Sequence, residues 1–456
     1  MKKTDIINWL KEHEEKFTQV AQRIWDNPQL AYEETYASEL QMNVLKEAGF
    51  TIENPIGELD TAFVASFGVG KPIIGILGEF DALPGLSQKA SAIQEEVVSD
   101  GAGHGCGHNL LGTAGVEAVI ALKEMMEQEG TQGSIRYYGC PAEEVLAGKT
   151  YMAKAGVFDD LDCALTWHPG NSNTVMDKSM QAMASIKFHF RGVTAHAAAA
   201  PHAGRSALDS VEIMNVGANY LREHVCDGVR IHYAITNGGL APNVVPEYAS
   251  VWYYIRAASK DEVRDILRRI KNIAKGAALM NETEVTSEIF AFPYETLPNN
   301  HLNKLMFHNM KKSNPIEYTD AEQDFAEKLV ETIEDHLRQK GGTFGNQVDG
   351  LLPTNISFDD YIIGKTIQGS TDVGDVSWIV PTGSISTTCA PVGVQLHSWQ
   401  ATASFGTSIG YKGMHLAASS MALTAYDILQ NKDNILDKAK EEFRELTKDS
   451  KYTPGI

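Results

Sequence analysis

Three side chains with high metal affinity lie close together in a glycine-rich stretch of this sequence. Residues 101–115 read GAGHGCGHNLLGTAG and carry His104, Cys106 and His108. Imidazole and thiolate are ligands that zinc and related transition metals prefer. An apolar pattern at helical spacing follows from Asn109, which can cap that helix. A single C-x-H pair is more often part of a turn than of a metal site. Alone, the stretch therefore indicates only a candidate ligand pair, Cys106 and His108.

Other carboxylates and histidines follow short apolar segments that are typical of strands. They are Glu79 and Asp81 after PIIGIL (72–77), Glu143 and Glu144 after GSIRYYGC (133–140), His168 after DCALTW (162–167), and His397 in the later segment QLHSW. In sheets of parallel strands, ligands bind beyond the carboxyl ends of the strands. We therefore expect these side chains to meet at one edge of a sheet.

The adjacent pair Glu143 and Glu144 suits a metal-dependent hydrolase. Neighbouring side chains point in different directions along an extended backbone. One carboxylate can bind metal while the other takes a proton from the attacking water. Taken singly, the pair could begin a solvated helix, and His168 could be a hydrogen-bonded core residue. Their common placement at consecutive strand ends favours the metal site.

Cys106 also permits a different interpretation, in which it is a catalytic thiol with His104 or His108 as its base. That arrangement lacks an obvious group to orient the base. It also leaves the adjacent glutamates without a function. We therefore favour the metal site over the thiol nucleophile.

The order of the expected elements divides the chain into two domains. In residues 1–182 and 298–456, strands alternate with helices, which predicts an α/β fold with a mostly parallel sheet flanked by helices. Residues 183–297 read strand-helix-strand-strand-helix-strand, the split βαβ order of an α+β, ferredoxin-like domain. We therefore expect a catalytic metal-binding domain with an inserted smaller domain.

Composition excludes several classes of partner. The 456 residues carry a formal net charge of −20, which disfavours binding to nucleic acid or to anionic membranes. The five cysteines are odd in number and widely spaced, so they indicate a reducing compartment rather than a disulfide framework. The N-terminal segment lacks the apolar core of a signal peptide, and no run is long enough to span a membrane. We expect a cytoplasmic protein that binds neither nucleic acid nor membrane.

Together, GHGCGHN, CPAEE, the strand end at His168 and the downstream His397 resemble the peptidase M20 family of metallohydrolases. The C-x-H pair resembles the amidohydrolase branch of that family, and the likeness covers nearly the whole chain, including the inserted domain. The resemblance implies two divalent metal ions, manganese or zinc first, with cobalt or nickel as alternatives. Cys106 would bridge the two ions. The remaining ligands would be His108 and His168 for one ion, and Glu144 and His397 for the other.

The resemblance also implies two further catalytic residues. Glu143 would be the general base, and Asp81 would orient a metal ligand. Many family members carry H-x-D where this chain has Glu79-Phe80-Asp81, as if His108 had taken over that ligand position. The wider family usually has Asp at the bridging position, and the softer thiolate of Cys106 leaves the native metal open.

The resemblance gives the inserted domain the functions of a lid and a dimer contact. His196 would stabilise the oxyanion in the active site of the partner protomer. Asn243 and Arg256 would bind the substrate's carboxylate, because a guanidinium fork presents two donors to two oxygens. A loop near the substrate would contain Gly369, Ser370 and Thr371. Without the resemblance, we would interpret His196 as a capping or packing residue and Arg256 as a surface residue of a strand.

The implied activity is hydrolysis of an amide bond next to a free carboxylate in a small N-acyl amino acid. We expect p-aminobenzoyl-glutamate as the substrate, with other N-acyl amino acids or dipeptides as the alternative. We also expect a homodimer through the inserted domain, or a hetero-oligomer with a homologous chain. A different class of function is a non-catalytic, metal-stabilised partner protein. The complete ligand set and the additional base Glu143 argue against that class.

Overall fold

The computed structural model describes residues 3–313, 316–338, 340–344, 346, 348–358 and 366–456. The chain forms two compact units. The first comprises Met1–Ser179, Leu297–Ile367 and Val376–Tyr452. The second comprises Met180–Thr296, Gln368–Asp375 and Thr453–Ile456.

The first unit is built on an eight-stranded sheet with the order β1-β2-β4-β3-β5-β14-β6-β12. Its strands are β1 (Thr51–Glu53), β2 (Phe63–Val69), β3 (Ile73–Glu79), β4 (Gly133–Cys140), β5 (Cys163–Gly170), β6 (Asn173–Val175), β12 (Ile356–Ser357) and β14 (Thr382–Thr388). The central strands β4, β3, β5 and β14 run parallel, which confirms the predicted α/β class.

Antiparallel pairs flank this parallel centre, so the sheet is mixed. β1 pairs antiparallel with β2, β2 with β4, and β6 with β14. Short linkers explain the direction of two of these strands, because a parallel crossover requires a dozen or so residues. Residues 54–62 join β1 to β2, so β2 runs back along β1. β6 begins three residues after β5 ends, so it runs opposite to β5 and therefore antiparallel to β14, which is parallel to β5.

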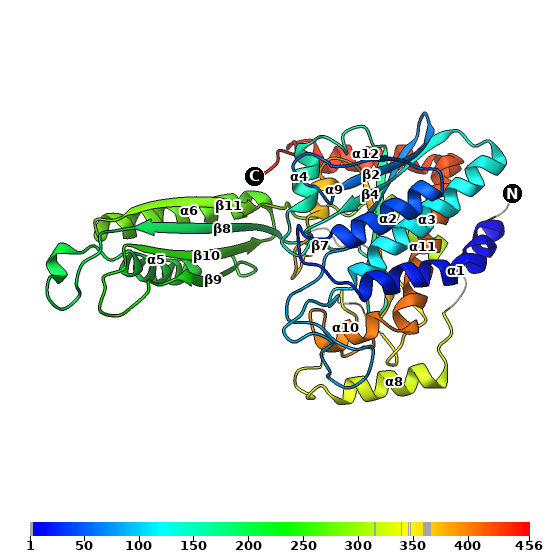
Figure 1. Ribbon diagram of the computed structural model, residues 1–456. Coiled ribbons are helices and arrows are strands. Elements are labelled where there is room, and N and C mark those ends of the chain that lie inside the picture. Colours follow the sequence, from blue (N-terminus) through cyan, green and yellow to red (C-terminus); the bar gives the residue numbers. More distant parts are fainter. Residues whose placement is uncertain (1–2, 314–315, 339, 345, 347, 359–365) are drawn as a thin grey trace. The chain divides into compact units, whose positions relative to one another are not determined.

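Helices cover both faces of this sheet. The helices that lie wholly or partly in the first unit are α1 (Lys3–Trp25), α2 (Thr35–Glu47), α3 (His108–Glu129), α4 (Gly148–Lys154), α7 (Asn300–Met310), α8 (Asp320–Glu331), α9 (Val373–Ser377), α10 (Trp399–Phe405), α11 (Ser408–Leu429) and α12 (Ile435–Thr447), and the first residues of α9 belong to the second unit. α3 and α11 lie on one side, and α4 and α12 lie on the other (Figure 1). α3 is buried on nearly all sides because β3, β4 and β5 pack against one face and α1 and α11 against the rest.

The second unit contains an antiparallel sheet with the order β11-β8-β10-β9 (Figure 1). In chain order its elements are β8 (Ala182–Arg191), α5 (Ala207–Leu221), β9 (Arg230–Asn237), β10 (Tyr248–Ala257), α6 (Lys260–Met280) and β11 (Glu284–Ala291). α5 and α6 pack against each other and against the sheet. Element order and strand order are those of a split βαβ unit, so the expected ferredoxin-like α+β fold is confirmed.

The remaining elements are short. They are β7 (Ser179–Met180) and β13 (Thr366–Ile367), which pair with each other, and the 3-10 helices Pro201–Ala203, Arg222–His224 and Lys432–Asn434. Among the helices in the described ranges, none has an apolar stretch that could cross a membrane.

Candidate functional site

Three central strands of the first unit end at the same edge of its sheet. β3 ends at Glu79, with Asp81 two residues beyond, and β4 is followed by Glu143 and Glu144. His168 lies near the end of β5. β3 is parallel to both β4 and β5, so these residues gather where sequence reasoning placed them.

The first turn of α3 places His108 among these carboxylates. Gly107, just before the helix, has φ of 82°, a left-handed conformation that glycine adopts without steric cost. His108 Nδ1 lies 2.8 Å from Asp81 Oδ1. Asp81 Oδ2 accepts a hydrogen bond of 2.8 Å from the backbone N–H of Glu144. Asp81 therefore orients a histidine and a glutamate that could both bind metal.

Cys106 lies at the centre of the cluster. It is buried, and its Sγ is 3.4 Å from His168 Nε2. The backbone N–H of His397 donates to the carbonyl of Gly105 at 2.9 Å, which joins the loop of His397 to the loop of Cys106. His397 Nε2 lies 3.5 Å from Glu144 Oε2. The His397 side chain is 53% exposed, so the cluster has an open side, as a catalytic metal site requires.

The ligand-type atoms form three overlapping groups, each within 4.8 Å. The groups are Cys106, His108 and His168; Cys106, Glu144 and His397; and Glu79, His108 and Glu143. The first two sets contain all five residues that the sequence predicts as metal ligands, and Cys106 belongs to both. Their coordination of metal stays a prediction.

The pKa values and the hydrogen bonding of the cluster indicate whether its residues suit a bound cation. Burial raises the pKa of the Cys106 thiol far above its usual value, and burial raises the pKa of Glu144 to about 7. Burial also lowers the pKa of His168 to about 4, so its imidazole is neutral. His108 Nε2 and Glu144 Oε1 are buried and make no hydrogen bond among the described residues. A bound dication would stabilise both anions and could take these two atoms as ligands.

The sequence reasoning missed two buried charged residues. Lys149 in α4 lies 2.6 Å from Glu79 Oε1, and both side chains are almost fully buried. Glu79 Oε2 lies in turn 3.3 Å from His108 Nε2. Glu34 is also fully buried and accepts a hydrogen bond from the backbone N–H of Ala142. The sequence held one signal for Lys149. Glu79 follows an apolar strand segment, and a carboxylate buried at the end of such a strand needs a positively charged partner.

In the second unit, the segments that carry His196 and Asn243 are paired. The backbone N–H of Ala197 donates to the Asn243 carbonyl at 3.0 Å, and both predicted residues are exposed. His196 Nδ1 accepts from the backbone N–H groups of Ala198 and Ala199, each at 3.2 Å. In a neutral imidazole, Nε2 then carries the proton. His196 can therefore donate a hydrogen bond from Nε2.

Arg256, in β10, has an unsatisfied buried donor. Its Nε makes no hydrogen bond with the described residues, its guanidinium lies 5.3 Å from the Tyr254 ring centre, and burial lowers its pKa. The loop that begins at Gly369 has a similar feature, because the buried Ser370 Oγ is also without a described partner. Thr371 Oγ1 instead accepts from a nearby backbone N–H. Arg256 and Ser370 thus retain donors for a polar ligand.

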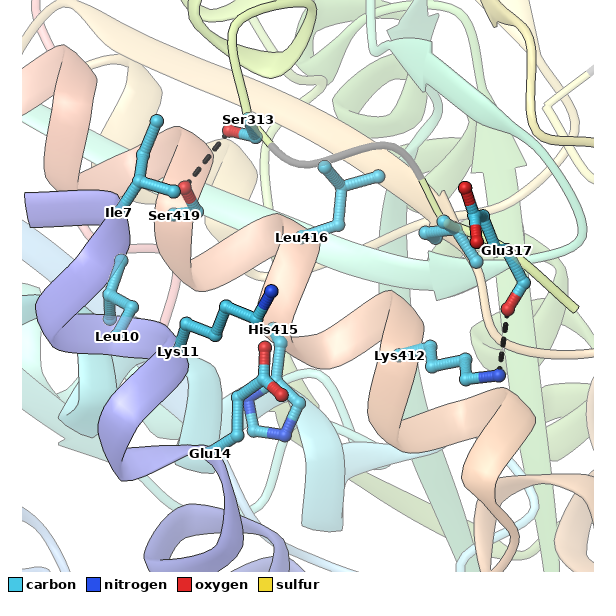
Figure 2. A pocket seen from close by; sticks show the side chains of 11 residues that line it. Ile7, Leu10, Lys11, Glu14, Ser313, Glu317, Lys412, His415, Leu416 and Ser419 are labelled. Carbon is cyan, nitrogen blue, oxygen red and sulfur yellow. Dashed lines mark hydrogen bonds between the residues drawn. The ribbon is translucent and has the colours of Figure 1, made fainter. Parts of the chain in front are cut away.

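A different hollow of about 400 Å³ lies between α1 and α11 in the first unit (Figure 2). His415 lines it, with Nδ1 2.9 Å from the buried Glu117 and Nε2 3.0 Å from Thr18 Oγ1. The imidazole is therefore engaged in structural contacts. The described lining residues do not come from the strand ends that carry the cluster, so we do not assign this hollow to the chemistry.

Comparison with known proteins gives the family. The family model described as a peptidase dimerisation domain matches residues 180–281. One of the p-aminobenzoyl-glutamate hydrolase subunits of Escherichia coli K12 is 41% identical, covering 96% of this chain and 94% of that protein. The Xaa-Arg dipeptidase of Mus musculus is 28% identical, covering 95% and 90%. A dinuclear metal-binding peptidase of the M20 family from Bacillus subtilis has a similar fold, with TM-score 0.60, 14% identity and coverage of 92% and 99%. The chain belongs to the M20 peptidase family, whose members hydrolyse amide bonds.

Proposed function

We propose that this chain is a two-metal amidohydrolase that cleaves p-aminobenzoyl-glutamate at the amide bond next to the free carboxylates. The observation that carries the proposal is the pair of ligand groups that share Cys106. A shared thiolate between two sets of donors is suited to two ions a short distance apart. The 41% identical relative supports the choice of substrate.

The proposed ligands divide between the two ions. Manganese or zinc fits these donors best, with cobalt or nickel as alternatives, because thiolate and imidazole favour softer metals and carboxylate favours manganese. When bound, such ions lower the pKa of water and polarise a carbonyl oxygen. His108 and His168 would hold one ion, Glu144 and His397 would hold the other, and Cys106 would bridge them.

Glu143 is the proposed general base. Its Oε2 lies 3.8 Å from His108 Nε2, and it belongs to neither Cys106-containing group. Glu143 would remove a proton from the attacking water while the oxygen bonds to the carbonyl carbon. It would then give that proton to the amide nitrogen as the C–N bond breaks. Asp81 would hold His108 and the Glu144 backbone in place throughout.

The second unit would supply the contacts that recognise the substrate. The Nε2–H of His196 would stabilise the oxyanion, and Asn243 and Arg256 would bind the carboxylate. The donor of Ser370 would lie near the substrate with Gly369 and Thr371. The dimerisation-domain match supports a homodimer through this unit, in which His196 acts on the partner's site. The 41% identical relative is itself one of the subunits of a hydrolase, which supports a hetero-oligomer as the alternative.

A second candidate is hydrolysis of a dipeptide or of another N-acyl amino acid. The 28% identity to a dipeptidase over most of the chain favours it, and any such substrate has the carboxylate that Arg256 would bind. Turnover of p-aminobenzoyl-glutamate, Xaa-Arg dipeptides and N-acetyl amino acids by the same preparation separates these candidates. We also place the protein in the cytoplasm, where its five free cysteines would remain reduced.

Two isosteric substitutions test the mechanism. Glu143→Gln should retain two metal ions per chain and lose about 10²–10⁴ in kcat. Glu144→Gln, the matched control one residue away, should lose one ion. Metal content by elemental mass spectrometry and turnover are measured on the same samples. Appreciable turnover in Glu143→Gln would rule out Glu143 as the general base. Full metal content in Glu144→Gln would rule out Glu144 as a metal ligand.

A further inference from the structure

The backbone on both sides of Glu143 is held by buried carboxylates from other parts of the chain. The N–H of Ala142 donates to Glu34 Oε1 at 2.8 Å, and the N–H of Glu144 donates to Asp81 Oδ2 at 2.8 Å. The turn that contains Glu143 is unusual for non-glycine residues, because Ala142 has φ of 55° and Leu146 has φ of 59°. Such a conformation persists only where the surroundings impose it.

Glu34 is fully engaged in this arrangement. It is 0% exposed, and its Oε1 also accepts from the backbone N–H of Tyr32 at 2.9 Å. Its Oε2 accepts from Thr61 Oγ1 at 3.1 Å. Burial, with the charge of Asp81, raises the pKa of Glu34 to about 7. A buried carboxylate is costly for the fold, and Asp81 nearby increases that cost.

Capping of a helix does not account for the Glu34 side chain. Glu34 occupies the N-cap position of α2, but its side chain makes no capping hydrogen bond there. Instead it reaches Ala142, which is 108 residues away in the chain. Glu33, the preceding residue, is exposed, so a solvated carboxylate at the start of α2 does not require Glu34. The buried Glu34 carboxylate therefore ties its own turn and Thr61 to residues 141–147, the loop that carries Glu143 and Glu144.

We propose that Glu34 is a positioning residue for hydrolysis, which holds the Ala142 amide so that the Glu143 carboxylate keeps its orientation toward the reacting water. This inference rests on the proposed function, in which Glu143 is the general base. Glu34 acts at one side of Glu143 as Asp81 acts at the other. Glu34 makes no contact with the Cys106-containing groups and is not itself a catalytic residue.

The test begins with Glu34→Gln, which keeps the shape of the side chain but replaces one acceptor oxygen by a donor. We expect kcat to fall about 10- to 100-fold, because a small displacement of a reacting group has effects of this size. KM and metal content should stay unchanged. Glu33→Gln is the matched control and should behave as the wild type. Thr61→Val removes one donor to Glu34 without altering the carboxylate, so it should give a smaller fall in kcat.

A structural readout accompanies the kinetics. Hydrogen–deuterium exchange should accelerate in Glu34→Gln within residues 141–147 and stay unchanged around Cys106. A wild-type kcat in Glu34→Gln, or unchanged exchange in that segment, would overturn the inference. If Glu34→Gln does not fold, Thr61→Val decides the question, and a wild-type kcat in that variant would overturn the inference.

A double variant separates this inference from the proposed function. If Glu34 acts through Glu143, then Glu34→Gln should add no loss to that of Glu143→Gln. Full additivity would overturn the positioning assignment while Glu143 remains the base. Retained turnover in Glu143→Gln would overturn the proposed function itself. An inactive Glu143→Gln together with a fully active Glu34→Gln would overturn the Glu34 assignment alone.

Discussion

Removal of the Cys106 thiol should weaken the binding of both metal ions together. Cys106 Sγ belongs to two groups, one with His108 and His168 and one with Glu144 and His397. In Cys106→Ala, each group keeps two of its three protein ligands. Loss of a hydrogen-bonding partner of a ligand alone weakens metal binding about 10- to 100-fold. Loss of a direct ligand should therefore cost at least about 100-fold per ion, equivalent to about 2.8 kcal/mol.

Chelator competition followed by elemental mass spectrometry measures this loss. The matched control is Cys163→Ala, because Cys163 is also a fully buried thiol, in β5, but belongs to none of the groups. The control should keep two ions per chain. His168→Ala and His397→Ala should each lose one ion, because each belongs to a single Cys106-containing group. Wild-type affinity for two ions in Cys106→Ala would refute the shared-ligand arrangement.

Three other perturbations test the surroundings of the site. Lys149→Met should lower the free energy of unfolding by about 3–5 kcal/mol, because Glu79 stays buried without its ammonium partner, and Glu79→Leu should restore part of the loss. A loss below about 1 kcal/mol in urea unfolding would contradict this. Burial lowers the pKa of His415, but Glu117 raises it more, so it lies above 6.5 in the fold. The stability that His415 contributes is therefore present below about pH 6.5 and is lost as pH rises through the folded pKa. The difference in urea midpoint between the wild type and His415→Gln should accordingly be smaller at about pH 9 than at about pH 6. An equal difference at both pH values would refute the protonated pair. Gly148→Ala would place a Cβ 1.7 Å from the backbone carbonyl oxygen of Pro141, in the loop that carries Glu143 and Glu144. The resulting displacement of this loop should lower kcat about 10²-fold. An unchanged kcat would show that the loop tolerates displacement.

Local sequence patterns predicted the parts of the site that follow strand ends. Cys106 and His108 are two positions apart, and Glu143 and Glu144 are adjacent, so their residue types and spacing already suggest shared chemistry. The split βαβ order was equally visible, because each of its elements has its own periodicity. These features depend on a short segment and on the general rule for parallel strands.

Partners that are distant in the chain could not be predicted in this way. Lys149 pairs with Glu79, seventy positions earlier, and Glu34 reaches Ala142 from the start of α2. In the sequence, Glu34 is the second of two adjacent glutamates, which is also the pattern of a solvated helix start. Only the packing of α2 and α4 near the strand ends distinguishes these buried charges from surface ones. The antiparallel pairs beside the parallel centre of the sheet were missed for a related reason, because pairing depends on linker length as well as on strand pattern.

The charge of the site connects the buried lysine with the metals. Five acidic groups gather around His108, and one ammonium pairs with them. The acidic groups are Cys106, Glu79, Asp81, Glu143 and Glu144, and the ammonium is that of Lys149. With all acids ionised and the histidines neutral, as metal binding requires, four negative charges remain, which two divalent ions would neutralise. Without Lys149, the Glu79 carboxylate would add a fifth charge beside His108 Nε2 and would compete with the proposed ligands for the ion. The lysine therefore offsets the charge of Glu79 next to His108 and leaves a net charge that two dications would balance.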